Sequence, residues 1–270
     1  MALVDVNDFG LDEVDVHFYL GVLLLLSMVL AFLALASGTV APYGRYAEVK
    51  SFDMSWGPAV PAKVAWVGQE APSLVVPIYC LWRQGWTAPG AGNRALLALF
   101  LAHYVNRTIV YPLRIRGGKP TPLGVAASAF GFTTINGYLQ GRALSAPWAA
   151  PVALDAPFAV GVAVFAAGAA GNCWHDGVLR RLRAARGGAT AGGYGIPRGG
   201  LYEYVSGANF LCEIVEWVGF AIAARTFAAA TFALCCALNV GPRAVHHHRW
   251  YLAKFDDYPR DRRALVPFVL

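Results

Sequence analysis

The chain has 270 residues, of which 57% are hydrophobic and only 14% are charged. Soluble domains carry about 25% charged residues, so this composition excludes an ordinary soluble globule and predicts an integral membrane protein. The formal net charge of +6 does not indicate a nucleic-acid partner, because the basic residues gather in a few connections between apolar segments.

Seven apolar segments are candidates for membrane-spanning helices, each of which needs roughly 20 residues. In chain order they are expected at 16–36, 60–81, 95–113, 122–141, 152–171, 202–223 and 227–240. Proline, glycine or short length weakens the second, fourth and last, so six and eight helices are the alternatives. The first segment follows an acidic lead, which favours a retained helix over a cleaved signal sequence. The expected fold is an all-α integral membrane bundle of seven helices.

Charge placement predicts the orientation of this bundle. Residues 1–15 hold five carboxylates and no Lys or Arg, and basic residues then gather at 45–50, 114–119, 180–198 and 243–263. The intervening connections hold only Arg83 and Arg94, then Arg142, then Arg225. Because basic connections stay in the cytoplasm, the N-terminus is expected outside and the C-terminus inside. We therefore expect one polytopic domain over 1–270, with an acidic extramembrane segment at 1–15 and a cytoplasmic tail at 242–270.

Polar and ionisable side chains recur in five of the seven predicted spans. They include Gln69, Glu70, His103, Tyr104, Asn106, Arg107, Asn136, Asn172, His175, Asp176, Asn209, Glu213 and Glu216. Helical spacing places Asn172 and Asp176 on one face, and Asn209, Glu213 and Glu216 on another. Such groups cannot face lipid cheaply, so we expect them to converge on one interior cavity.

Two other interpretations of these polar residues stay open. Buried amides often do no more than join helices, and this explanation has equal weight for Asn136 and Gln140. It suits the carboxylates poorly, because a carboxylate at such depth needs a partner or a ligand. A transport pathway is the second alternative, but the sequence shows no internal repeat with paired broken helices.

No metal site and no Rossmann domain are expected. Consecutive residues point about 100° apart on a helix, so His246, His247 and His248 would not chelate one ion from one face. The five cysteines show no metal-ligand spacing. The glycine-rich stretch 193–199 lacks the preceding strand that a dinucleotide fingerprint requires. The phosphates of a nucleotide would instead be held by Arg and by amide or hydroxyl donors.

Several blocks of sequence carry a more specific signal. They are 69–73 (Gln-Glu-Ala-Pro-Ser), 103–104 (His-Tyr) with 107–111, 136–141, 196–201, 204–217 and 243–268. These blocks resemble the steroid 5α-reductase family, the 3-oxo-5α-steroid 4-dehydrogenases, and are similar to its type 2 branch. The resemblance runs from residue 43 to residue 270. The Ala- and Arg-rich composition is typical of a high-GC genome such as a bacterial one.

The resemblance implies NADPH-dependent reduction of the C4–C5 double bond of a 3-oxo-Δ4-steroid inside a helix bundle. Glu70 and Tyr104 match the pair that the family places at the substrate carbonyl, and Trp66 and Phe210 are implied to line the steroid slot. Hydride addition at C5 develops negative charge on the C3 oxygen, which positioned donors must stabilise. Tyr104 can donate its phenolic proton, whereas Glu70 can donate only when it is protonated.

The same resemblance implies a set of NADPH-binding residues, partly in the predicted tail 242–270. They are Asn172, Asp176, Arg183, Tyr194, Asn209, Glu213, Arg243, His247 and Tyr251. Asn209 and Glu213 are implied to reach the nicotinamide amide, and Arg183 and Arg243 to clamp phosphates. The chain departs from the family at Gly195, where a basic residue is frequent. It departs again at Ser128, where vertebrate members can have Arg.

Two alternatives in function are retained. One is a reductase of another lipid enone or of an enoyl thioester. The other is a non-enzymatic steroid- or lipid-binding membrane protein, which a bound, oxidisable NADPH would exclude. The more remote isoprenylcysteine methyltransferases share C-terminal features but lack the Glu70 and Tyr104 pair. The expected partners are a steroid or related lipid and membrane lipids, without nucleic acid. We expect a monomer in a bacterial inner membrane, or in the endoplasmic reticulum of a eukaryote.

Overall fold

The structure is a computed structural model, and it describes residues 12–46, 56–115, 117–185 and 194–270. Five charged residues on which the orientation prediction drew lie outside these ranges: Asp5, Asp8, Lys50, Arg116 and Arg186.

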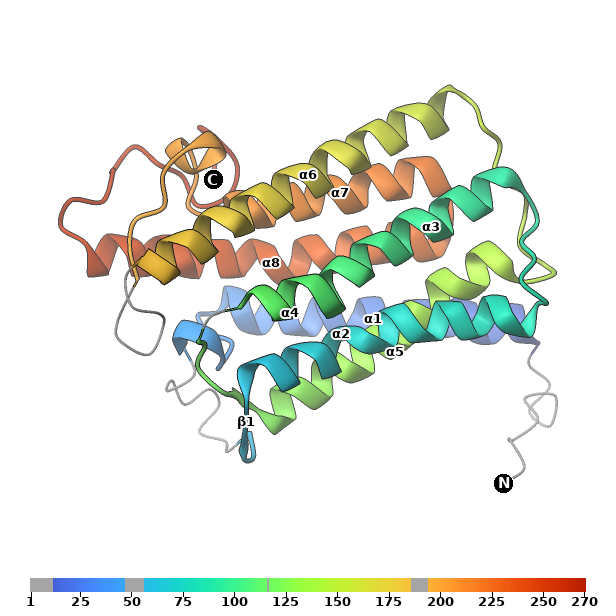
Figure 1. The fold of residues 1–270 in the computed structure, drawn as a ribbon, viewed down its shortest axis with the longest axis horizontal. Helices are drawn as coiled ribbons and strands as arrows, with labels where there is room; N and C mark the ends of the chain where they lie inside the picture. Colours follow the sequence, from blue (N-terminus) through green and yellow to red (C-terminus); the bar gives the residue numbers. More distant parts are fainter. Residues whose placement is uncertain (1–11, 47–55, 116, 186–193) are drawn as a thin grey trace.

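The described residues form seven long helical rods that run back and forth along the molecule (Figure 1). They are α1 (Glu13–Ala36), α2 (Ala62–Arg83), α3 (Ala91–Val105) continued through a π-helical turn (Asn106–Val110) into α4 (Tyr111–Arg114), α5 (Leu123–Ser145), α6 (Ala156–Ala185), α7 (Ala208–Ala224) and α8 (Phe227–Lys254). Two 3₁₀ turns lie at Gly44–Tyr46 and Gly200–Glu203. The strands β1 (Ala59–Val60) and β2 (Thr121–Pro122) pair antiparallel and add a short ribbon to a fold that was expected to be all-α.

Four of these rods are long and apolar enough to cross a membrane. They are α1, the continuous α3–α4 helix from Ala91 to Arg114, α6 and α8. The fold is therefore that of a largely helical membrane protein. The number of crossings, seven, stays a prediction.

Three helix ends differ most from the predicted spans. The sixth span was expected from residue 202, but α7 begins at Ala208. The backbone N–H groups of Ser206 and Gly207 instead donate to carbonyls at 263 and 264, so this segment pairs with the end of the chain. The last span was expected to end at 240, yet α8 runs through Pro242 to Lys254. Proline has a helix-compatible φ and removes only one hydrogen bond here, so the first part of the tail 242–270 is helical. Similarly, α6 continues beyond residue 171 to Ala185.

The start of α1 also differs from the prediction. Asp12 caps the helix by accepting a hydrogen bond from the Asp15 N–H at 2.8 Å. Glu13, the first helical residue, accepts two hydrogen bonds from the Arg142 guanidinium at 2.5 and 2.6 Å and one from Trp148 Nε1 at 3.1 Å. Glu13 and Asp15 are therefore helical, and the extramembrane location of residues 1–15 stays a prediction. Arg142, expected as a loop charge, is buried in an ion pair between α1 and α5.

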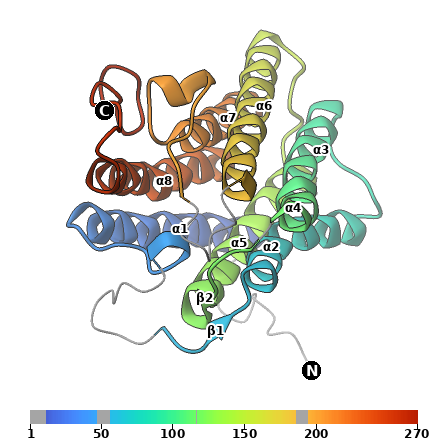
Figure 2. The same cartoon turned by 60° about the vertical axis from the view of Figure 1, so that its left-hand side comes forward.

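The helices pack as two halves. In the α2–α5 half, α2 lies along α5 and the α3–α4 helix completes the group; in the α6–α8 half, α6 lies along α7, and α8 packs on α7 (Figure 2). Small residues allow close approach of helices in membranes. A Cβ at Gly137 of α5 would come within 2.9 Å of the Pro72 carbonyl of α2, and one at Gly168 of α6 would overlap the backbone of Glu216 in α7. α1 lies against α8 and α5 and so joins the two halves.

An aromatic core lies where the two halves meet. Phe100 of α3 and Trp217 of α7 are 0% and 1% exposed, and their ring centroids are 5.7 Å apart. Trp217 in turn meets Phe232 of α8 at 4.4 Å. Burial of large aromatic side chains contributes strongly to packing, so this cluster holds α3 against α7 and α8.

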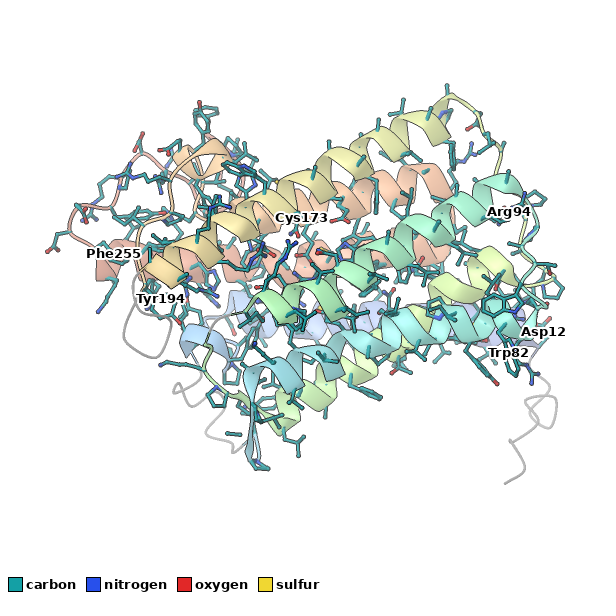
Figure 3. The ribbon with its side chains drawn as sticks, viewed as in Figure 1. Asp12, Trp82, Arg94, Cys173, Tyr194 and Phe255 are labelled. Carbon is teal, nitrogen blue, oxygen red and sulfur yellow. The ribbon has the colours of Figure 1, made fainter. Side chains whose placement is uncertain are left out.

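The two ends of the bundle differ in charge. Because successive rods alternate in direction, the described residues of the basic connections lie together at the end that holds Tyr194 and Phe255 (Figure 3). The opposite end, with Asp12, Trp82 and Arg94 (Figure 3), has few basic residues. We call these the basic end and the opposite end. Trp82 is 55% exposed, as is typical of aromatic residues at a membrane–water interface.

Candidate active site

A buried arginine, Arg107, connects the two halves of the bundle. Its guanidinium lies 3.7 Å from the Glu70 carboxylate of α2 and 3.4 Å from the Asp176 carboxylate of α6, and its side chain is 12% exposed. The rings of Trp66 and Tyr111 flank it, with centroids at 4.8 and 5.2 Å. One cation thus joins the predicted catalytic Glu70 to the predicted cofactor residue Asp176.

The π-helical turn determines how the Arg107 backbone is satisfied. The Tyr111 N–H donates to the Asn106 carbonyl, five residues back, and Pro112 has no N–H to donate. The Arg107 carbonyl therefore loses both of its possible intrahelical donors. Trp66 Nε1 supplies the missing hydrogen bond at 3.0 Å. Single π turns inside α-helices are frequent at functional sites.

From Asp176, hydrogen bonds continue across the interface between α6 and α7. Asn209 Nδ2 donates to Asp176 Oδ1 at 3.0 Å. Asn172 Nδ2 donates to the Asn209 carbonyl at 3.0 Å and is 3.4 Å from Glu213 Oε2. The Tyr202 hydroxyl lies 3.4 Å from Asn209 Oδ1. The face shared by Asn172 and Asp176 and the face shared by Asn209 and Glu213 are confirmed, and they meet each other beside Arg107.

Tyr104 lies one helical turn before Arg107 and is 3% exposed. Its phenol oxygen accepts a hydrogen bond from Asn136 Nδ2 at 3.5 Å. Gln140 Nε2 donates to Asn136 Oδ1 at 3.2 Å and to the carbonyl of Ala228 in α8 at 2.9 Å. Gln140 thus joins helices, whereas Asn136 serves the predicted catalytic tyrosine. No direct hydrogen bond between Tyr104 and Glu70 occurs in the part of the chain that the structure describes.

A second group of predicted residues surrounds a small cavity at the basic end. The cavity is lined by Val40, Ala41, Tyr43, Tyr46, Arg243, His246 and His247. The Arg243 guanidinium lies over the rings of Tyr43 and Phe210, at 4.8 and 5.2 Å from their centroids. His247 stacks on Tyr46 at 5.6 Å. A cation, an imidazole and phenols therefore converge between α8 and the segment that follows α1.

Arg45, which follows α1, completes this group. Its guanidinium lies over three rings, those of Tyr194 at 5.1 Å, Trp250 at 4.5 Å and Tyr251 at 4.9 Å. Arg45 Nη1 and the Tyr46 hydroxyl are buried and have no hydrogen-bond partner among the described atoms. Burial raises the pKa of Tyr46 to about 12, so this phenol keeps its proton. Buried donors without partners are costly, so this end suits a ligand rich in acceptor oxygens.

The three consecutive histidines make separate contacts. His247 faces Tyr46, whereas His248 Nδ1 lies 2.7 Å from the Ser206 hydroxyl. His246 lines the cavity from the neighbouring position. Within the described ranges, no group of three or more His, Cys, Asp or Glu side chains is arranged to hold a metal ion.

Comparison with known proteins identifies the family. The sequence profile described as 3-oxo-5-alpha-steroid 4-dehydrogenase matches residues 119–270. Over 263 residues the chain is 44% identical to 3-oxo-5-alpha-steroid 4-dehydrogenase 1 of Mus musculus, covering 96% of this chain and 100% of the relative. The chain belongs to the 3-oxo-5-alpha-steroid 4-dehydrogenase family. The type 2 proteins of Sus scrofa and Homo sapiens are 43% and 42% identical over 242 residues, each covering 88% of this chain and 91% of the relative.

For this 3-oxo-5-alpha-steroid 4-dehydrogenase family member, the structure divides the predicted cofactor residues into two sets. The first set lies in mid-bundle and contains Asn172, Asp176, Asn209 and Glu213. The second set lies at the basic end and contains Tyr194, Arg243, His247 and Tyr251. Arg183 lies near the C-terminal end of α6. Phe210 packs against His247 at 5.3 Å, whereas Trp66 packs against Arg107, so the two predicted steroid contacts lie in different groups.

The sequence indicated a functional site at one of two arginines, Arg107, but not at the other, Arg45. Arg107 was identified as a polar residue within a span but received no role, although an intramembrane arginine is itself an indication of a site. Arg45 gave no such signal, because it lies in a connection and 206 residues from its partner Tyr251. Only the fold brings Arg45 to the predicted cofactor residues.

Proposed function

We propose that this protein reduces the C4–C5 double bond of a 3-oxo-Δ4-steroid with NADPH. The observation that carries the proposal is the buried chain from Glu70 through Arg107 to Asp176 and Asn209, which links the predicted carbonyl donors to the predicted cofactor residues. The family relationship supports the steroid substrate, because the relatives are named for a 3-oxo-5-alpha-steroid.

The residues present fit a nicotinamide dinucleotide, which when bound would supply a hydride. In mid-bundle, the Asn172 and Asn209 amides and the Glu213 carboxylate offer the donors and acceptor that a carboxamide requires. At the basic end, Arg45 and Arg243 supply cations. The unpartnered donors there suit phosphate oxygens, which bind guanidinium groups strongly. We infer that Arg183, Tyr194, His247 and Tyr251 complete this phosphate end.

Tyr104 and Glu70 would stabilise the charge that develops on the substrate. Reduction at C5 leaves negative charge on the C3 oxygen, and preorganised donors in a water-poor site lower that barrier most. The Tyr104 hydroxyl accepts from Asn136 and also hydrogen-bonds with the Ser73 side chain, so its proton would turn from Ser73 to the substrate oxygen. Glu70 donates when protonated, and Arg107 at 3.7 Å adds positive charge beside it. C4 then takes a proton from water or through this pair.

The proposed arrangement in the membrane follows from the charges at the two ends. We propose one polytopic domain that crosses the bilayer seven times, with the basic end in the cytoplasm and the N-terminus outside. NADPH would enter from the cytoplasm at the basic end, and the steroid from the bilayer toward Trp66 and Phe210. The monomer would be sufficient for this chemistry, because all proposed residues come from one chain.

The direct test uses purified protein in detergent with NADPH and a 3-oxo-Δ4-steroid. The expected product carries two additional hydrogens by mass, and NADPH deuterated at the transferred position should place its label at C5. The Glu70→Gln/Tyr104→Phe double variant is the matched control. Reduction of a non-steroid lipid enone alone would refute the substrate class. A protein that binds steroid but never oxidises NADPH would refute the reductase.

A further inference from the structure

A second buried acid–base pair joins the two halves of the bundle, separately from Arg107. His103 Nδ1 of α3 lies 2.6 Å from Glu216 Oε1 of α7, with side chains 7% and 1% exposed. Glu216 Oε2 is buried and has no hydrogen-bond partner among the described atoms. A polar pair at this depth costs desolvation that its own attraction hardly offsets, so a role beyond stability has to be sought for it.

The position of the pair indicates that role. His103 immediately precedes Tyr104, and the edge of its ring packs against the tyrosine ring, with centroids 5.0 Å apart and planes at 73°. On α7, Glu216 follows Asn209 and Glu213 at helical spacing, so the three share one face. The contact between His103 and Glu216 therefore connects the residue next to Tyr104 to α7. Tyr104 is the proposed carbonyl donor, and α7 carries the proposed nicotinamide-binding residues.

The proposed reaction depends on alignment between the two halves. Tyr104 belongs to the α2–α5 half, whereas the mid-bundle cofactor residues belong to the α6–α8 half. Reacting groups must be held about 3–3.5 Å apart, and an error of about 1 Å costs about 10²-fold in rate. Near Tyr104, α3 contacts α7 first through Phe100 and Trp217 and, one turn later, through His103 and Glu216. Aromatic contacts tolerate sliding, whereas a hydrogen bond fixes the register.

We propose that His103 and Glu216 are positioning residues that hold the Tyr104 phenol in register with the cofactor residues of α7. This inference rests on the proposed function, since it assigns the pair a part in that reaction. Neither residue needs to touch the substrate. On the α3 side, the contact positions Tyr104 because the ring of His103 packs on the tyrosine ring. On the α7 side, it positions the cofactor residues because Glu216 shares a helix face with Asn209 and Glu213.

The test compares Glu216→Leu and Glu216→Gln with the control Glu13→Gln, which removes the partly exposed carboxylate of another interhelical ion pair at the opposite end. Glu216→Leu should lower the single-turnover rate of hydride transfer by about 10- to 100-fold, with NADPH affinity unchanged within about twofold. The kinetic isotope effect with deuterated NADPH should increase, because the chemical step becomes limiting. Glu216→Gln, which can still hydrogen-bond to His103, should lose less. Glu13→Gln should lower the unfolding midpoint and leave the isotope effect unchanged.

A cofactor-free measurement separates this inference from the proposed function. With 3-fluorotyrosine at position 104, Glu216→Leu should shift the fluorine NMR signal, and Glu13→Gln should not. An unshifted signal with an unchanged rate overturns the inference and leaves the reductase intact. Parallel loss of NADPH affinity and rate also overturns it, because Glu216 would then belong to the cofactor site. If Glu216→Leu does not fold, Glu216→Gln and His103→Gln give the same comparison. Failure of the unaltered protein to reduce any steroid counts against the proposed function alone.

Discussion

Replacing Arg107 by Met should destabilise the protein even without ligands. At an effective dielectric constant of about 20, charges 3.4 and 3.7 Å apart attract by about 4–5 kcal/mol per pair, and desolvation offsets much of this gain. The substitution leaves the Asp176 carboxylate, and that of Glu70 whenever it is ionised in the absence of substrate, without their cation. Breaking a buried ion pair by removing one partner costs about 3–5 kcal/mol. At about 2–4 °C per kcal/mol for a chain of this size, the midpoint of thermal unfolding in detergent should fall by about 6–20 °C.

A compensating variant tests whether unpaired carboxylates cause this loss of stability. If the loss comes from unpaired carboxylates, Arg107→Met combined with Glu70→Gln and Asp176→Asn should recover most of the stability, since a buried ion pair is often replaceable by neutral groups. Arg94→Met, at an exposed position, is the control and should change stability by no more than about 0.5 kcal/mol. A triple variant less stable than Arg107→Met, or an Arg107→Met protein that unfolds like the unaltered one, would contradict the electrostatic explanation.

Three further predictions concern the proposed reaction. Glu70→Gln and Tyr104→Phe should each lower turnover by about 10²–10³-fold while NADPH binding, measured by fluorescence, is retained; near-normal turnover in both would remove the proposed donors. Arg45→Ala and Arg243→Ala should weaken NADPH by about 10- to 150-fold, because a hydrogen bond to a charged group contributes about 1.5–3 kcal/mol. NADH should lose less if either arginine meets the additional phosphate, and full NADPH preference in both variants would place the clamp elsewhere. In sealed, oriented vesicles, NADPH should support reduction only from the face that bears the α6–α7 connection, and activity from the other face alone would refute the topology.

Sequence periodicity predicted the mid-bundle part of the candidate site well. The spacing of Asn172 and Asp176, and of Asn209 and Glu213, determines which side chains share a helix face. The cost of exposing such groups to lipid then requires the two faces to meet inside the bundle. Both inferences need only local geometry and solvation, and the contacts across the α6–α7 interface confirm them.

The ends of the helices could not be predicted in the same way. Hydropathy detects where a segment leaves an apolar environment, whereas a helix continues as long as its backbone is satisfied and one face is packed. For that reason α6 and α8 extend beyond their apolar stretches. The pairing of Glu13 with Arg142 and the group around Arg45 depend on contacts distant in sequence, and no local pattern encodes them.

The hydrogen bond from Trp66 to the Arg107 carbonyl constrains how the proposed steroid slot can change during evolution or engineering. Truncating an aromatic side chain is the usual way to enlarge an apolar pocket for a bulkier lipid. At Trp66 this change would also remove the only donor described for a carbonyl that the π turn has released, and an unsatisfied group within a membrane is costly. A slot that accommodates larger substrates should therefore widen at positions other than Trp66, or acquire a replacement N–H or O–H donor in the same step.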